Sequence, residues 1–140
     1  MKILPPDIYV DHTGTAKGRG VFAGCEFKAK ELVEVAPVIV FRVHALPRLV
    51  ATILFQWDEL AKVPNTRAIA FGYGSLYNHA NPSNMRYEAD TVRQAIKFTA
   101  VRSIAVGEEL TINYNAIGGG AEWSNDHWFD LYGIVRLKDE

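Results

Sequence analysis

Three unusual segments lie far apart in this chain of 140 residues, in an order and spacing that few folds would require together. Residues 17–22 place two glycines around an arginine, and residues 78–84 hold three asparagines, a histidine and a proline. Residues 107–115 lead from a turn into a tyrosine followed by an asparagine. Each segment alone is most simply a turn, a loop or a strand end. Their combination restricts the fold.

Short apolar runs separated by turn residues predict a mainly β domain. Pro37 divides two of these runs, and proline cannot donate to a sheet ladder, so we expect an edge position or a bulge there. Two glycines interrupt the apolar residues 68–74, which predicts that backbone passes close to other atoms. The predicted strands cover residues 8–10, 20–23, 31–35, 38–41, 87–90, 95–101 and 110–114.

Residues 46–57 leave two structures open. Their apolar side chains fall at helical intervals, whereas the β-branched and aromatic residues 52–55 are equally compatible with a helix followed by a strand. We expect one or two short helices in the chain. A loop is predicted at residues 62–66, and three consecutive glycines at 118–120 predict a flexible joint before an aromatic tail.

Composition predicts a single domain and excludes several kinds of partner. The chain is 49% hydrophobic and has a net charge of −1, so it can cover one core but lacks the cationic field that binds nucleic acid. We expect no direct contact with nucleic acid and no membrane span, since no apolar stretch approaches about 18 residues. The N-terminus does not resemble a secretory signal, which favours a cytoplasmic protein, with a secreted effector or a nuclear protein in a host as alternatives.

Cysteine and histidine usage argues against crosslinks and metals. Cys25 is the only cysteine, so no internal disulfide can form, and a small buried side chain is its simplest role. The four histidines include no pair at metal-ligand spacing. We therefore expect no metal site.

The three segments resemble, in identity, order and distance, the motifs of the SET-domain protein lysine methyltransferases. A segment like residues 18–23 opens that domain, one like Asn78-His79 forms its centre, and one like residues 107–114 closes it. The resemblance runs from about Ile8 to about Trp128 and is nearest to the minimal members of bacteria and large viruses.

This resemblance implies a single SET domain over residues 1–140, with a core at about 8–114 and a post-SET-like tail at about 115–140. The implied fold is mainly β, with several small sheets and a C-terminal pseudoknot. The family's methyl donor is S-adenosylmethionine. The positions that correspond to donor-binding residues of the family are Lys17, Gly18, Arg19, Gly20, Asn78, His79 and Trp128, the last as an aromatic cover for the adenine.

Tyr114 matches the family's catalytic tyrosine, and Tyr87 matches a position that helps decide how many methyl groups are added. With Tyr77, Tyr87 is assigned to the channel for the substrate lysine. A lysine amine with a pKa near 10.4 must lose its proton before it attacks, and an apolar channel beside a positive sulfonium disfavours its charged form. Solvent can take the proton, since no general base is evident in the sequence.

The implied partner is a basic protein or peptide, such as a histone tail or a bacterial protein, attracted by acidic residues at 58–59 or 108–109. A homodimer through Phe41 or Val43 is a further expectation. Two alternatives stay open on the residues alone. The chain could be an inactive SET-like module that binds a lysine-containing peptide or an adenosyl ligand, or a purely structural β-domain in which His79 only makes hydrogen bonds.

Overall fold

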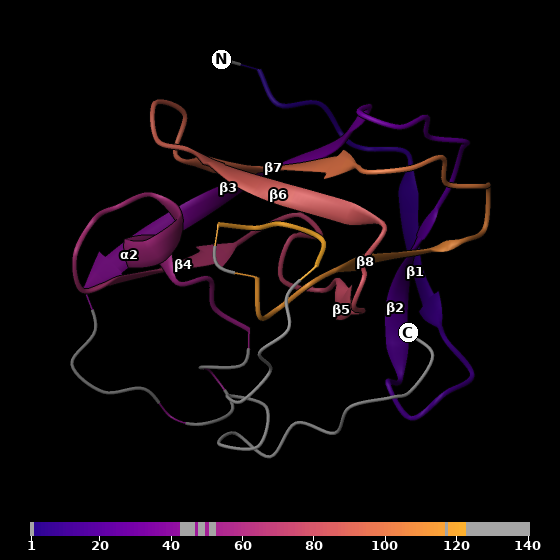
Figure 1. Cartoon of the computed structure of the whole chain (residues 1–140), viewed down its shortest axis with the longest axis horizontal. Helices are drawn as coiled ribbons and strands as arrows, with labels where there is room; N and C mark the ends of the chain where they lie inside the picture. Colours follow the sequence, from indigo (N-terminus) through magenta and orange to yellow (C-terminus); the bar gives the residue numbers. More distant parts are fainter. Residues whose placement is uncertain (1, 43–46, 48–49, 51–52, 117, 123–140) are drawn as a thin grey trace.

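The structure is a computed structural model that describes residues 2–42, 47, 50, 53–116 and 118–122. The predicted mainly β architecture is confirmed, with one short helix in this part of the chain (Figure 1). The elements are β1 (Ile8–His12), β2 (Arg19–Ala23), β3 (Leu32–Arg42), α2 (Trp57–Leu60), β4 (Thr66–Ala70), β5 (Asn78–His79), β6 (Met85–Asp90), β7 (Ala95–Ala100) and β8 (Glu109–Ile112).

These strands form two four-stranded sheets, with orders β1-β2-β8-β5 and β4-β3-β7-β6. In Figure 1 the first sheet occupies the right of the molecule, and the second crosses its upper left. The first sheet brings together the three sequence segments, because β8 pairs with β2 on one side and with β5 on the other. The β5–β8 pairing is parallel, with Asn78 opposite Thr111 and His79 opposite Ile112.

Strand β3 runs through Pro37 without a break, which corrects the predicted interruption. Its first half pairs with β7 up to Pro37, and its second half pairs with β4 from Val38 onward. The carbonyl of Pro37 accepts from the N–H of Phe71, the first residue after β4. Pro37 therefore lies where the pairing with β4 ends, so its lack of an N–H does not interrupt that ladder. The register shift in β3 lies near its start, between Leu32 and Glu34, and not at the proline.

Other boundaries also differ from the predictions. The segment predicted as a loop at residues 62–66 ends in β4, and Asn78-His79 forms a strand instead of a loop. Strand β8 ends at Ile112, so Tyr114 lies beyond it and not at its last position. Most of the ambiguous segment 46–57 lies outside the described residues. Its described end excludes a continuous helix, because Phe55 forms a bridge with Ala68 and α2 begins only at Trp57.

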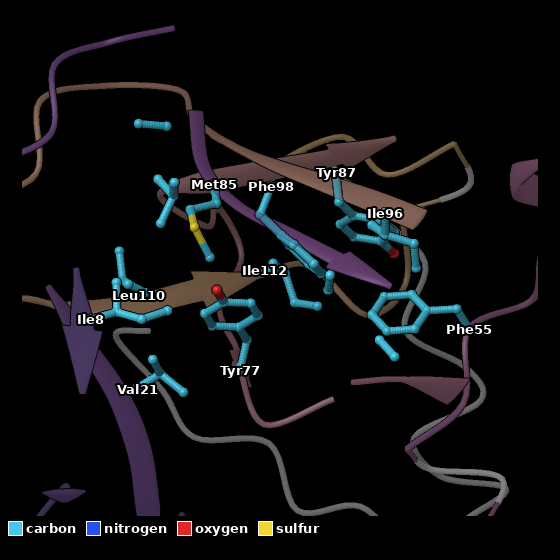
Figure 2. Packing of buried hydrophobic residues seen from close by; sticks show 14 of the residues in the cluster. Ile8, Val21, Phe55, Tyr77, Met85, Tyr87, Ile96, Phe98, Leu110 and Ile112 are labelled. Atoms are coloured by element: carbon cyan, nitrogen blue, oxygen red, sulfur yellow. The ribbon is translucent and has the colours of Figure 1, made fainter. Parts of the chain in front are cut away.

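The core lies between the two sheets and is rich in aromatic rings (Figure 2). Phe98 on β7 is fully buried, with ring centroids 4.8 Å from Tyr77 and 5.9 Å from Tyr87. The predicted close approach at residues 68–74 is confirmed at Gly74, where an added Cβ would lie 2.6 Å from the Cβ of Ala70. The apolar runs and Gly74 therefore pack together in the same core.

The residues after β8 lie against β6 and the segment before it. The N–H of Tyr87 donates to the carbonyl of Gly119 at 2.9 Å, and the N–H of Ser83 donates to the carbonyl of Ala121 at 3.0 Å. A Cβ on Gly119 would lie 1.8 Å from the Tyr87 carbonyl oxygen, so only glycine fits. The triple glycine therefore makes specific contacts at its centre, where the sequence predicted a flexible joint.

No helix among the described residues is both long and apolar enough to cross a membrane. Likewise, the described histidines, cysteines and carboxylates form no group of three that could hold a metal ion. Cys25 is half-buried and packs against the core.

Candidate active site

One cluster of polar groups forms where β2, β5 and β8 meet. The side-chain amide of Asn78 donates to the main-chain carbonyl of Arg19 at 3.0 Å and to Oε2 of Glu109 at 2.8 Å. Nζ of Lys17 lies 3.4 Å from the other carboxylate oxygen, Oε1. We call Lys17, Arg19, Asn78 and Glu109 the Glu109 cluster. It joins members of all three sequence segments.

The two glycines beside this cluster have different roles. A Cβ on Gly20 would lie 2.5 Å from Oε2 of Glu109 and 3.0 Å from Nδ2 of Asn78, so this glycine allows the cluster to close. Gly18 has φ +79° and open space where its Cβ would be. Its N–H and carbonyl are both bonded within the turn, to Thr15 and Thr13. Gly18 therefore leaves open space beside the turn without offering its own polar groups.

Tyr114 is held at three points by Tyr77 and His79. Its N–H donates to Nδ1 of His79 at 3.1 Å, its ring centroid lies 5.4 Å from that of the imidazole, and its hydroxyl donates to the main-chain carbonyl of Tyr77. Because Nδ1 of His79 accepts a hydrogen bond, the neutral imidazole carries its proton on Nε2. The parallel pairing of β5 with β8 brings these residues together from positions about 35 residues apart.

The surroundings keep the phenols of Tyr114 and Tyr87 protonated. Burial, the negative charge of Glu109 and the neighbouring Tyr87 raise the pKa of Tyr114 well above its ordinary value. Burial and the charge of Glu59 likewise raise the pKa of Tyr87. At neutral pH both hydroxyls are therefore hydrogen-bond donors and not bases. The same negative surroundings favour a positively charged group nearby.

The two predicted channel tyrosines contribute in different ways. The Tyr87 ring packs edge-on against Phe55 with centroids 5.3 Å apart, and its hydroxyl lies 3.4 Å from the carbonyl oxygen of Asn113. Tyr77 is only 1% exposed and donates its hydroxyl to Oε1 of Glu34 at 2.6 Å. Figure 2 shows its ring among the core side chains. What Tyr77 offers to Tyr114 is its main-chain carbonyl.

Three buried polar residues had no predicted role: Glu34, which bonds Tyr77, and Asn113 and Asn115, which flank Tyr114 in the sequence. Glu34 and Asn113 are both buried, and Asn113 bonds the carbonyl of Ala121 and the N–H of Asn115. Asn115 is 7% exposed, and its amide atoms have no partner among the described residues. Asparagines on both sides of Tyr114 were the available signal. The predicted adenine cover, Trp128, lies outside the described residues.

The comparisons with known proteins agree on one family. The model of the SET domain matches residues 18–115, a range that includes all of the three sequence segments except Lys17. The chain belongs to the SET-domain family. In this family a methyl group passes from S-adenosylmethionine to the side-chain amine of a protein lysine, and this SET-domain protein is accordingly a protein-lysine N-methyltransferase by family.

A curated relative supports the same family. The Schizosaccharomyces pombe histone-lysine N-methyltransferase specific for lysine 37 of histone H3 is 30% identical to this SET-domain protein over 103 residues. The match covers 70% of this chain and 67% of the yeast protein.

Solved structures show the fold. A crystal structure of a candidate histone methyltransferase from Plasmodium falciparum has a TM-score of 0.65 and 23% identity, and the match covers 80% of this SET-domain protein and 96% of that chain. A chain of the Polycomb repressive complex 2 of Chaetomium thermophilum, bound to S-adenosylmethionine, has a TM-score of 0.65 and 21% identity. That match covers 81% of this chain and 16% of the Polycomb chain.

The residues of this SET-domain protein fit an adenosyl donor in their chemistry. The Glu109 cluster places a cationic and an anionic side chain beside the open turn at Gly18. Such a pair suits a ligand that itself carries both signs of charge, as S-adenosylmethionine does. The phenol and carbonyl oxygens around Tyr114 suit the positive sulfur of the same ligand.

Proposed function

We propose that this protein methylates a lysine in a basic segment, with a histone tail as the first candidate, and that Tyr114 is its catalytic residue. The observation that carries this proposal is the double anchoring of Tyr114, whose N–H bonds His79 and whose hydroxyl bonds the carbonyl of Tyr77. A phenol fixed in this way points its oxygen in one direction. Fixed geometry is a large part of what enzymes contribute to a transfer between two bound groups.

The donor would be held by Lys17, Gly18, Arg19, Gly20, Asn78 and His79, with Trp128 as the aromatic cover. The donor supplies an electrophilic methyl group on a positively charged sulfur. Gly18 gives open space beside the turn. The side-chain amide of Asn78 is held in a single orientation by its two hydrogen bonds, to the carbonyl of Arg19 and to the carboxylate of Glu109. An amide fixed in advance loses little entropy when a ligand binds.

The substrate lysine would approach between aromatic rings. Burial and negative charge keep the hydroxyls of Tyr87 and Tyr114 protonated, and ring faces together with carbonyl oxygens stabilise a cationic nitrogen as it forms. Apolar walls disfavour the charged amine before the reaction, which lowers the pKa of the lysine. Solvent takes the proton before the lysine is enclosed.

Tyr87 would limit the number of methyl groups. Its hydroxyl lies against the carbonyl of Asn113, and its ring is fixed by Phe55 and Phe98. A phenol in this place occupies room that a larger methylated amine would need. We propose mono- or dimethylation as the product, with higher states in Tyr87→Phe.

The attraction of a basic segment rests on acidic residues that are only partly neutralised within the chain. Asp58 forms an ion pair with Arg67 at 3.1 Å, and Glu108 forms one with Arg102 at 2.7 Å. The charge of Glu59, in contrast, contributes with burial to the raised pKa of Tyr87. We place the substrate on the Glu59 side for this reason. A negative field near the channel raises the rate at which a positive peptide arrives.

The extent of the domain and its oligomeric state are also part of the proposal. The close spacing of the motifs supports a minimal SET domain of the kind found in bacteria and large viruses, with its core at about 8–114 and its tail at about 115–140. We also propose a homodimer through Phe41 or Val43, which sedimentation equilibrium would test. Phe41 is half-buried in the monomer, and Val43 lies outside the described residues.

The substrate is identified with an array of basic peptides, incubated with the protein and S-adenosylmethionine and read by mass spectrometry. We expect mass gains of one or two methyl groups on a small set of lysine peptides, lost when arginine replaces the target lysine. A protein that binds the donor but adds no methyl to any peptide would be a binding module, and the proposal would be wrong.

A further inference from the structure

Glu34 on β3 is a buried carboxylate that none of the chemistry above uses. The residue is 4% exposed, and both of its carboxylate oxygens accept hydrogen bonds. The hydroxyl of Tyr77 donates to Oε1 at 2.6 Å, and the N–H of Tyr73 donates to Oε2 at 2.9 Å. No ion pair to Glu34 occurs in the described part of the chain. A buried carboxylate without a cation is costly unless its acceptors are satisfied.

The backbone is shaped to admit this carboxylate. Gly72 has φ +63°, and a Cβ there would lie 2.6 Å from Oε2 of Glu34. Residues 71–76 form the turn that connects β4 toward β5, and Tyr73 and Tyr77 both belong to this connection or its end. Glu34 therefore ties β3 to the segment that leads directly into Asn78-His79.

A continuous path of contacts leads from Glu34 to the phenol of Tyr114. The side chain of Tyr77 is fixed by Glu34, and its ring packs on Phe98 at 4.8 Å. The main-chain carbonyl of the same residue accepts the hydroxyl hydrogen of Tyr114. Because this side chain and this carbonyl belong to one residue, a shift of Tyr77 as a whole would move the carbonyl, whereas rotation of the side chain alone would not.

We propose that Glu34 is a positioning residue: by holding the side chain of Tyr77, it sets the place of the carbonyl that orients the hydroxyl of Tyr114. The inference rests on the proposed role of Tyr114 in methyl transfer. Glu34 itself touches neither substrate nor donor in this account. Its effect is on the angle and distance of one hydrogen bond.

The main test is Glu34→Gln, which keeps the size of the side chain. Both partners of Glu34 are donors, so the new NH₂ group must face one of them, and either Tyr77 or Tyr73 loses its acceptor. With saturating donor and peptide we expect kcat to fall about tenfold, whereas KM for the donor stays within about twofold. In protein labelled with ¹³C at tyrosine Cζ, the resonance of Tyr114 should shift although Glu34 does not contact it.

A second variant, Tyr77→Phe, keeps the ring and the carbonyl and removes only the hydroxyl. It should lower kcat as well, and combining it with Glu34→Gln should add little beyond the larger single effect, since the proposal has both variants act through the Glu34–Tyr77 contact. Tyr77→Phe carries the test if Glu34→Gln does not fold. The matched control is Val33→Ala, the buried apolar neighbour on β3. It should lower the melting temperature but leave kcat and the Tyr114 resonance unchanged.

The outcomes separate the two proposals. If Glu34→Gln and Tyr77→Phe only lower the melting temperature, as Val33→Ala does, with wild-type kcat and an unmoved Tyr114 resonance, then Glu34 has no positioning role. If the wild type transfers no methyl group at all, the proposed function fails, and the Tyr114 resonance still decides whether Glu34 positions the phenol.

Discussion

Glu34 and Glu109 both hold polar groups next to Tyr114, in opposite surroundings. Glu34 is 4% exposed and is bonded by neutral donors, whereas the side chain of Glu109 is 20% exposed and is bonded by the Lys17 ammonium and the Asn78 amide. Burial raises the pKa of Glu34 despite hydrogen bonds from Tyr77 and Tyr73 that lower it. Glu109 instead raises the pKa of the Tyr114 phenol through its charge.

Glu34 and Glu109 thus contribute to one site in two different ways. A buried carboxylate with fixed partners sets geometry, because the surrounding core leaves it no room to move. A partly exposed carboxylate beside a cation and open space can adjust when a ligand arrives, and water screens its charge. We expect changes at Glu34 to appear in stability and kcat, and changes at Glu109 to appear in donor affinity.

The largest difference should appear on truncation. Glu34→Ala leaves the hydroxyl of Tyr77 and the N–H of Tyr73 without acceptors in the core, and we expect a loss of about 3 kcal/mol in the free energy of unfolding. Glu109→Ala should cost below about 1 kcal/mol but weaken donor binding. Urea unfolding and calorimetric titration with S-adenosylmethionine measure the two effects. Equal losses of stability in both variants would contradict the comparison.

A smaller difference is expected when a methyl group is pushed against each glutamate. Gly72→Ala meets Oε2 of Glu34 at 2.6 Å in a left-handed backbone, so we expect a cost of about 2 kcal/mol. Gly20→Ala meets Oε2 of Glu109 at 2.5 Å, where the side chain can move toward solvent, so the cost should be about 1 kcal/mol. Donor affinity should fall mainly in Gly20→Ala. The reverse order of stabilities, measured by urea unfolding, would show that Glu109 is the more rigid carboxylate.

The smallest expected effect is on the dependence of stability on pH. The pKa of Glu34 is raised in the folded state, so the folded protein binds this proton more tightly than the unfolded chain. The stabilisation is complete below the ordinary carboxyl pKa and is lost as the pH rises through the folded value. The free energy of unfolding of the wild type minus that of Glu34→Gln should therefore decrease as the pH rises from 4. A difference that grows over this range would show that Glu34 prefers to be charged.

Local patterns predicted the strands well but not their long-range pairing. Alternating and apolar runs indicated β1, β2, β6, β7 and β8 within a few residues, because these signals depend on neighbours in sequence. The two-residue strand β5 looked like a loop, since its ladder is with β8, more than 30 residues away in the sequence. Pro37 was expected to break β3, whereas the change of partner strand there makes its missing N–H harmless.

The site shows the same limit. Tyr114, Asn78 and His79 were predicted from their motifs as site residues, and the structure places them close together. The use of the Tyr77 carbonyl could not be predicted, because it depends on how Tyr77 is placed in the fold, and the hydroxyl of Tyr77 bonds Glu34, which lies 43 residues earlier. A buried glutamate on a strand gives no signal of its partner until the turn at Gly72 is placed beside it.

The most direct test of the central claim is single-turnover methyl transfer by Tyr114→Phe, measured beside donor binding. The variant keeps the ring and the N–H bond to His79 and loses only the hydroxyl that bonds Tyr77. We predict donor binding within about threefold of wild type and a transfer rate lower by at least about 100-fold. Transfer at the wild-type rate with equal donor binding would contradict the account.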